Sequence, residues 1–210
     1  MAHPVLSSEA SGCFYIGGSP CAGKSTVADL VARRHGLGVF HCDDTVRRRH
    51  ALVTSAASPS LRELTTLDDC ARFGRDPAWQ ADKEVLYYRE QFPFLLDELR
   101  AVTGPVLVEG ADLLPELIRD HIGELGRAVW IVPTPEFQLE HYRRRSWAHE
   151  LVAGCAEPDR AFENWMRRDM LFAEYVAGTA TRLQGTVVEV DGSRSVDEVA
   201  AEVEARLSLV

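Results

Sequence analysis

The segment from Gly18 to Ser25 constrains this chain more than any other, because it matches the pattern G-x-x-x-x-G-K-[ST] without a mismatch. Glycines let the backbone fold around a phosphate group, so that successive N–H groups and the start of the following helix point at its oxygens. Lys24 then reaches the outer phosphates, and the hydroxyl of Ser25 can bind Mg²⁺. The residues predicted to bind phosphate or nucleotide here are Gly18, Ser19, Pro20, Cys21, Ala22, Gly23, Lys24, Ser25 and Thr26.

Apolar runs alternate with helical patterns along the chain. Strands are predicted at residues 13–16, 39–42, 105–109, 128–132 and 186–190. Helices are predicted at residues 24–35, 85–99, 160–177 and 196–207, with Pro93 expected to bend the second of them or reset its start. This alternation favours an α/β fold with a parallel sheet covered by helices on both faces. A length of 210 residues predicts one domain over residues 1–210.

The composition excludes several classes of protein. With 46% hydrophobic and 26% charged residues, the chain has the make-up of an ordinary globular protein rather than a disordered one. No apolar run reaches the roughly 18 to 20 residues of a membrane helix, and residues 1–12 have no signal-peptide pattern, so we expect a cytoplasmic protein. A net charge of −9 disfavours a membrane or a long nucleic acid as partner. The oligomeric state is not predicted.

The five cysteines are odd in number and far apart, and no pair has the CxxC spacing. They are Cys13, Cys21, Cys42, Cys70 and Cys155. This distribution disfavours both a disulfide framework and a thiolate zinc site. We therefore expect reduced and mostly buried thiols.

Three carboxylates follow predicted strands. Asp43 and Asp44 come after residues 39–42, and Glu109 ends residues 105–109. Parallel sheets gather functional groups at the carboxyl ends of their strands. In phosphoryl transfer, one carboxylate accepts the proton of an acceptor hydroxyl and another acts through Mg²⁺. We assign Asp43 the first role and Glu109 the second, with Asp44 beside the acceptor; the alternatives are a helix cap for the aspartates and an ion pair with arginine for Glu109.

Phosphoryl transfer also needs a positively charged group that closes over the migrating phosphoryl group. Arginines late in the chain are candidates for this group. Arg143, Arg144 and Arg145 are consecutive, so on a helix they cover about 200° and do not all face one point. We expect one or two of them to reach phosphate, with Arg143 and Arg144 as the catalytic candidates. Arg167 and Arg168 are further candidates, and a solvated helix face is the alternative for each arginine.

These residues together resemble the small P-loop kinases. This group includes nucleoside monophosphate, shikimate and gluconate kinases, chloramphenicol phosphotransferase and the zeta-toxin-like kinases. The resemblance rests on GGSPCAGKST after an apolar strand, on VFHCDD and VLVEG, on the arginine-bearing segment and on the closing VDGSRS. It spans nearly the whole chain, and the phosphate loop is its most specific part.

The resemblance implies a P-loop NTPase fold with a five-stranded parallel sheet in the order 2-3-1-4-5, ATP as donor and Mg²⁺ as cofactor. It also implies that Asp43 matches the acid used as a base, that residues 143–168 form an arginine-bearing lid, and that Gly192 and Ser193 hold adenine. Residues 45–82 are then the acceptor-binding region, with Arg47 as a substrate contact, and Trp79 and Tyr87 are aromatic residues that could line it.

The leading hypothesis is an ATP-dependent kinase that phosphorylates a hydroxyl group of a metabolite, antibiotic or nucleoside-like molecule. Nucleoside monophosphate kinases usually follow their third strand with an Asp-Gly-hydrophobic-Pro-Arg run, whereas Gly110, Ala111 and Asp112 follow here. Such a kinase, with a phosphate held by Arg47–Arg49, is the first alternative. A non-catalytic ATP-binding regulatory module is the second. A GTPase is disfavoured because the only two lysines, Lys24 and Lys83, leave no N-K-x-D motif.

Overall fold

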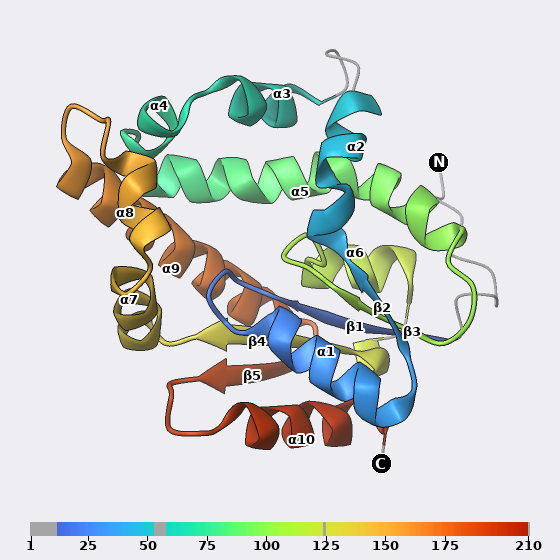
Figure 1. The fold of residues 1–210 in the computed structure, drawn as a ribbon. Coiled ribbons are helices and arrows are strands. Elements are labelled where there is room, and N and C mark those ends of the chain that lie inside the picture. The colour runs from blue at the N-terminus through green and yellow to red at the C-terminus, as the bar shows by residue number, and fades with distance from the viewer. Residues whose placement is uncertain (1–11, 53–57, 124, 210) are drawn as a thin grey trace.

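The computed structural model of the protein describes residues 12–52, 58–123 and 125–209. At its centre is an all-parallel sheet in the order β2-β3-β1-β4-β5, which confirms the predicted fold class and strand order (Figure 1). The strands are β1 (Cys13–Gly18), β2 (Gly38–His41), β3 (Val106–Glu109), β4 (Ala128–Pro133) and β5 (Thr186–Val190). Glu109 is in register with both Ile16 and His41, so β1, β3 and β2 bring their carboxyl ends to the same edge of the sheet.

Helices cover both faces of the sheet, as predicted (Figure 1). The covering helices are α1 (Lys24–His35), α5 (Pro77–Arg100), α6 (Pro115–His121), α9 (Pro158–Arg182) and α10 (Val196–Arg206). Alternate strand residues supply the two cores, because successive side chains of a strand point to opposite faces. Tyr15 of β1 belongs to the core under α5, α6 and α9, which also holds Phe92 and Phe172. Ile16 belongs to the core under α1 and α10, which also holds Val203.

Helix α5 starts earlier than the sequence predicts. It begins at Pro77, after Asp76 caps its first turn, and it continues through Pro93, so this proline does not mark its start. A proline inside a helix removes one backbone hydrogen bond. Phe92 and Leu95, both buried on either side of Pro93, hold the helix against the sheet across this point. Neither α5 nor any other described helix is long and apolar enough to span a membrane.

The remaining helices form two groups at the carboxyl edge of the sheet. The predicted acceptor region contains the 3₁₀ helix η2 (Cys42–Thr45) and the helices α2 (Val46–Leu52), α3 (Pro59–Thr66) and α4 (Asp69–Phe73). The second group contains α7 (Pro135–Arg143) and α8 (Ser146–Val152), while the 3₁₀ helix η3 (Leu125–Arg127) leads into β4. In Figure 1, α3 and α4 lie along α5, and α7 and α8 lie beside the start of α9. A separate apolar cluster that includes Phe73, Tyr142, Val152 and Trp165 joins α4, α7, α8 and α9.

The prediction that all cysteines are reduced is wrong for two of them. Cys70 of α4 and Cys155 of the α8–α9 turn form a disulfide across 85 residues of sequence. The ring of Phe73 stacks on that of Trp165 with centroids 4.6 Å apart, and this contact between α4 and α9 brings the two thiols together. An odd number of cysteines does not prevent a single pair. The free cysteines are Cys13 and Cys42, which are buried, and Cys21, which is half-buried.

Candidate active site

The loop between β1 and α1 has the backbone geometry that phosphate binding requires. Gly18, with φ of 132°, packs so closely on β4 that a Cβ atom would lie 1.9 Å from the carbonyl oxygen of Ile131. Gly23, with φ of 74°, precedes α1 and provides no side-chain cap, and the first turn of α1 has no acidic residue. The N–H groups at this helix end therefore have no side-chain acceptor and can bind an anion.

Lys24 lies across the loop. Its Nζ donates a 2.9 Å hydrogen bond to the carbonyl oxygen of Ser19 and is 4.0 Å from Oε1 of Glu109. Above the loop is a cavity of about 360 Å³, here called the phosphate cavity, which residues 20–26 line. Asp43, Tyr88, Glu109, Tyr142 and Arg145 also line it. Gly18 and Ser19, which the sequence predicted as nucleotide contacts, lie at the base of the loop outside this lining.

Glu109 is buried where β3 ends, and its two carboxylate oxygens face different bases. Oε1 faces Lys24, whereas Oε2 is 3.0 Å from Nδ1 of His41, the last residue of β2. Nε2 of His41 is 3.2 Å from Oδ1 of Asp29. Although burial alone would lower it, the carboxylates of Glu109 and Asp29 raise the pKa of His41. Lysine and histidine, rather than the arginine considered from sequence, are thus the partners of Glu109.

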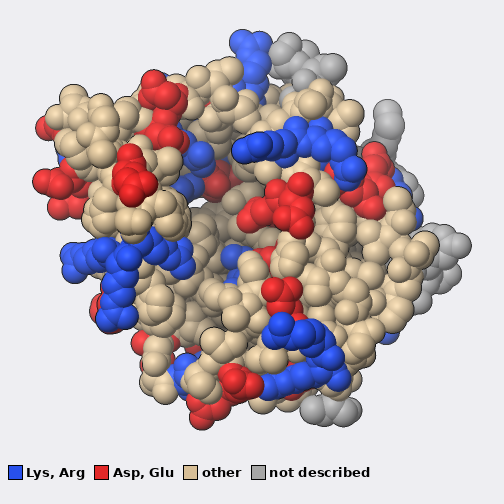
Figure 2. Space-filling model, viewed as in Figure 1, with Lys and Arg blue, Asp and Glu red and all other residues tan. Residues whose placement is uncertain are grey.

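Asp43 occupies the junction of two cavities. It lies in η2 directly after β2, with an exposed side chain, and lines both the phosphate cavity and a second cavity of about 450 Å³. Tyr88 of α5 also lines both. Figure 2 shows this face hollowed between the lobe of α7 and α8 and the body that carries α1 and α2. Asp44, the other predicted aspartate, is exposed and lines neither cavity.

The second cavity, here called the acceptor cavity, lies among η2, α2, α3, α4 and α5. Its lining includes Val46, His50, Leu64, Arg72, Glu84 and Tyr87. Tyr87, which the sequence offered as a lining residue, thus faces this cavity. Trp79 does not line it and instead has the guanidinium of Arg75 over its ring, 4.6 Å from the centroid.

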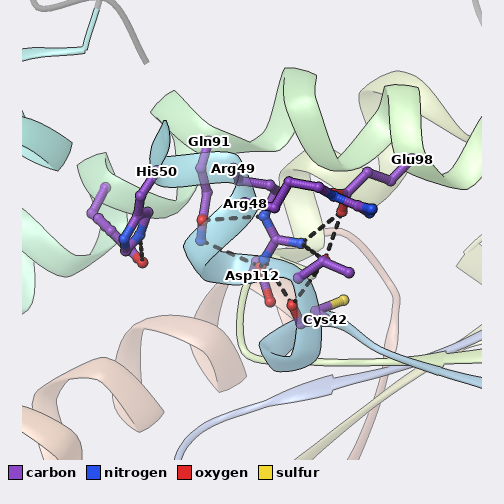
Figure 3. Close-up of polar contacts among 9 residues, drawn as sticks. Cys42, Arg48, Arg49, His50, Gln91, Glu98 and Asp112 are labelled. Carbon is purple, nitrogen blue, oxygen red and sulfur yellow. Dashed lines mark hydrogen bonds and ion pairs between the residues drawn. The ribbon is translucent and has the colours of Figure 1, made fainter. Parts of the chain in front are cut away.

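Arg49 holds η2, the short helix that contains Asp43, through a buried hydrogen bond (Figure 3). Its fully buried guanidinium donates from Nη2 to the carbonyl oxygen of Cys42 at 2.9 Å and to Oδ2 of Asp112 at 2.7 Å. Nη1 donates to Oε2 of Glu98 at 3.0 Å. One side chain thereby joins the end of β2, the loop after β3 and helix α5. Burial raises the pKa of Asp112 to about 6, against the opposing effect of Arg49.

Two of the three arginines in Arg47–Arg49, the triplet considered for an acceptor phosphate, are already ion-paired. Nη2 of Arg48 pairs with Oε1 of Glu98 at 2.9 Å, and Arg49 is committed to its buried contacts. Arg47 is exposed and lines neither cavity, so the structure does not bring it to the acceptor cavity.

Among the three consecutive arginines, the structure brings Arg145 to the phosphate cavity. Its guanidinium lies 5.2 Å from the ring centroid of Tyr142 and 5.8 Å from that of Trp147. Arg143 lines a different hollow, between α7, α8 and α9, and Arg144, which follows α7, forms a surface ion pair with Glu140 of that helix. Helix α7 ends at Arg143 and α8 begins only after Arg145, so the helical spacing assumed from sequence does not hold across this turn.

Arg168, another predicted candidate for phosphate, is instead buried among carboxylates. Its Nη1 donates to Oε2 of Glu84 at 2.7 Å, and its Nε is 2.6 Å from Oδ1 of Asp169. Nη2 of Arg72 donates to the same oxygen of Glu84 at 2.7 Å. Arg167 is exposed and pairs with Glu174 within α9. Neither Arg167 nor Arg168 lines the phosphate cavity.

The loop after β5 contains the two residues predicted to hold adenine. Gly192 has φ of 85°, and a Cβ atom there would lie 3.0 Å from the ring of Phe137. The backbone N–H of Ser193 donates to Oδ1 of Asp191 at 2.9 Å, which closes the turn. Both residues are exposed and stand outside the lining of the phosphate cavity, so their role stays a prediction.

Several residues that line the two cavities have no distinguishing pattern in the sequence. Tyr88, Tyr142 and the pair Arg72–Glu84 all lie in helices, where their spacing is that of ordinary helix faces. No sequence motif marks them, because each helix face acquires its role only from the elements packed against it.

The residues present fit Mg²⁺ held mainly by nucleotide phosphates. Within the described ranges, no group of three His, Cys, Asp or Glu side chains is arranged to hold a metal ion. Mg²⁺ requires fewer protein ligands, because phosphate oxygens and water complete its coordination. Ser25 and Glu109, the predicted metal contacts, both line the phosphate cavity beside Asp43.

A scan against protein-family models and a search of curated proteins each find no match. Solved structures do match. The shikimate kinase from Bacteroides thetaiotaomicron is 16% identical with a TM-score of 0.52, over 93% of this chain and 98% of that one. The shikimate kinase from Aquifex aeolicus vf5 is 20% identical with a TM-score of 0.46, over 93% and 96%. A gluconokinase from Sinorhizobium meliloti 1021 is 15% identical with a TM-score of 0.42, over 94% and 92%.

The sheet order and the glycine loop between β1 and α1 define a P-loop nucleotide-binding fold. Within that class, the likeness to the Bacteroides structure shows that the chain has the fold of the small P-loop kinases. The resemblance seen in the sequence is thus confirmed at the level of fold.

Proposed function

We propose that this protein is an ATP-dependent kinase that transfers the γ-phosphate to a hydroxyl group of a small molecule. The observation that supports this best is the position of Asp43, whose carboxylate lines both cavities at their junction. A hydroxyl group bound in the acceptor cavity would meet the phosphate cavity at this residue. Different residues bind the triphosphate, orient Glu109 and accept the proton.

Residues 20–26 bind the triphosphate, and Gly18 and Ser19 form the base of their loop. The N–H groups of the loop and of the start of α1 donate to phosphate oxygens, and Lys24 neutralises the outer phosphates. Ser25 and Glu109 would hold Mg²⁺, which would neutralise negative charge on the nucleotide phosphates. His41 keeps Glu109 oriented through its 3.0 Å contact. Gly192 and Ser193 keep their proposed role beside the adenine.

Asp43 acts as the general base. As the acceptor oxygen bonds to the γ-phosphorus, the bond between that phosphorus and the bridging oxygen of ADP breaks, and the hydroxyl proton passes to Asp43. The products are ADP and a phosphate ester. Arg49 supports this step through the carbonyl of Cys42, which immediately precedes Asp43. From the lid, Arg145 supplies the positive charge that the sequence assigned to Arg143 and Arg144.

The test combines a screen with a matched pair of variants. ADP release with Mg·ATP is measured over alcohols, sugars, antibiotics, nucleosides and mononucleotides, and at least one hydroxyl-bearing compound should stimulate it. Asp43→Asn should lower stimulated turnover by at least about 100-fold and leave Mg·ATP binding intact. Asp44→Asn, one residue away and outside both cavities, should change turnover by less than about threefold.

Three results would contradict the proposal. Full turnover by Asp43→Asn would remove the assigned base. Stimulation by mononucleotides alone would establish the nucleoside monophosphate kinase alternative. Binding of Mg·ATP without stimulation by any compound would favour a regulatory ATP-binding module.

A further inference from the structure

Among the described residues that line the acceptor cavity, Arg72 is the one basic side chain apart from His50, and it is already paired. Nη2 of Arg72 donates to Oε2 of Glu84 at 2.7 Å. Arg168 donates to the same oxygen from the buried side, also at 2.7 Å. Although burial alone would raise it, the guanidinium groups of Arg168 and Arg72 hold the pKa of Glu84 below its usual value. Glu84 is therefore ionised at neutral pH and cancels the charge of Arg72.

The other positive groups on the helices around this cavity are paired, are neutral or lie outside its lining, as the exposed Arg47 and Arg62 do. Arg48 and Arg49 share Glu98 as an ion-pair partner. Burial, assisted by the nearby positive charge of Arg49, lowers the pKa of His50, and its Nε2 is 2.7 Å from the hydroxyl oxygen of Tyr87. The residues outside the described ranges include no lysine or arginine. Every lysine and arginine of the chain is therefore among the described residues.

The start of α3, one of the helices that line the cavity, also has its backbone donors paired. The backbone N–H groups of Ser60 and Leu61, at the start of α3, donate to the carboxylate of Glu90 at 3.1 and 2.7 Å. These donors are thereby withdrawn from any ligand. The phosphate cavity differs in its donors, because it has Lys24, Arg145 and the uncapped start of α1. The two cavities are thus opposite in their capacity to bind anions.

Asp43 adds a negative charge that faces the acceptor cavity. A phosphate or carboxylate bound there would meet this charge, would find no unpaired guanidinium, and would lose its hydration without replacement. The rest of the lining suits an uncharged molecule with an apolar side. Val46, Leu64, Tyr87 and Tyr88 supply apolar and aromatic surface, and about 450 Å³ is a volume typical of sites for drug-sized ligands.

We infer that the acceptor is an uncharged, hydroxyl-bearing molecule with an aromatic or other apolar face, and that Glu84 excludes phosphate- and carboxylate-bearing acceptors by pairing with Arg72. This inference rests on the proposed kinase function and specifies its substrate class. Glu84 is a specificity-determining residue that acts through the arginine rather than through the reacting atoms.

The first experiment compares matched acceptors that differ by one anionic group. ADP release is measured with thymidine and thymidine 5′-monophosphate, with glucose and glucuronate, and with an aryl diol and the same diol bearing a ring carboxylate. We expect turnover with a neutral member and at least about tenfold less with its anionic counterpart. Greater turnover with an anionic member would overturn the inference and leave the kinase proposal standing.

The second experiment needs no turnover, so it separates the failure of this inference from the failure of the kinase proposal. Binding of inorganic phosphate is measured by calorimetry with the protein saturated by Mg²⁺ and a non-hydrolysable ATP analogue. Glu84→Gln leaves Arg72 unpaired while Arg168 keeps its contact with Asp169. This variant should bind phosphate at least about tenfold more tightly than the wild type. Equal binding by the two proteins would overturn the inference.

Arg72→Gln is the matched control and guards against a Glu84 variant that does not fold. Glu84 keeps Arg168 as a partner in this variant. Phosphate binding should be as weak as in the wild type, because Arg72 is not available to an anion in either protein. A wild type that binds phosphate and loses at least about tenfold in affinity through Arg72→Gln would show an available guanidinium and overturn the inference.

Discussion

Nη2 of Arg49 donates a 2.7 Å hydrogen bond to Oδ2 of Asp112, and both side chains are almost fully buried. Arg49 belongs to α2 and Asp112 to the loop after β3, so this ion pair joins two segments separated by 63 residues. Both segments border the candidate site, because Arg49 also holds the carbonyl that precedes Asp43. The buried pair thus connects the strand ends that carry Asp43 and Glu109.

Replacing Arg49 should destabilise the fold strongly. Arg49→Met leaves the buried carboxylate of Asp112 without its cation, and loss of one partner from a buried pair costs about 3–5 kcal/mol. Urea denaturation measures the free energy of unfolding. Arg48→Met is the control, because its exposed side chain pairs with the same Glu98 and should cost less than about 1 kcal/mol. Equal losses in the two variants would contradict the role of Arg49.

Asp112 should make the stability pH-dependent. Its folded-state pKa of about 6 exceeds its ordinary value of 3.8, so the folded protein favours the protonated carboxyl. This contribution is fully present below about pH 4 and is lost as the pH rises through about 6, by at most about 3 kcal/mol. Denaturation series from pH 4 to 7 should show the free energy of unfolding falling relative to that of Asp112→Asn. A constant difference between the two proteins would contradict this assignment.

The disulfide should stabilise the packing of α4 on the lid. Cys70→Ser with Cys155→Ser should lower the free energy of unfolding by about 2–4 kcal/mol, because the cross-link restricts the unfolded chain. Thermal unfolding with and without dithiothreitol measures the effect. The reductant should lower the Tm of the wild type and leave that of the double variant unchanged. If the reductant also lowered the Tm of the double variant, its effect would not come from the disulfide between Cys70 and Cys155.

The three consecutive arginines offer a direct comparison of the sequence prediction with the structure. Arg145→Ala should lower kcat/KM for ATP by at least about tenfold, because Arg145 alone among them lines the phosphate cavity. Arg143→Ala and Arg144→Ala should stay within about twofold of the wild type. Steady-state kinetics on the acceptor identified in the screen provide the measurement. A larger loss in Arg143→Ala or Arg144→Ala would favour the sequence prediction.

The two lysines of the chain form a matched pair for testing nucleotide binding. Lys24→Ala should weaken Mg·ATP binding by at least about tenfold, because it removes the cation beside the phosphate loop. Lys83→Ala removes a lysine that pairs with Glu63 away from the loop, and it should leave affinity unchanged. Isothermal calorimetry measures both. Unaltered heats of binding in Lys24→Ala would remove the basis of the proposed function.

Much of the fold follows from the sequence. The loop at Gly18–Ser25 is local in sequence, so its glycines and the following helix specify its shape without help from distant residues. The order of the parallel strands follows the resemblance and was confirmed. The ends of α5 were less predictable, because Pro93 is tolerated only where buried neighbours such as Phe92 compensate for the lost hydrogen bond.

Tertiary structure decided the features that depend on distant partners. Cys70 meets Cys155 because α4 docks on the lid, and no spacing in the sequence encodes that contact. Arg145 reaches the phosphate cavity because α7 ends two residues earlier, whereas the sequence prediction placed all three arginines on one helix and chose Arg143 and Arg144. Arg72 carries a charge in the sequence, but Glu84 cancels it in the folded chain. Sequence determines which charges a protein carries, and folding determines which stay available, because pairing and burial depend on groups brought together from far along the chain.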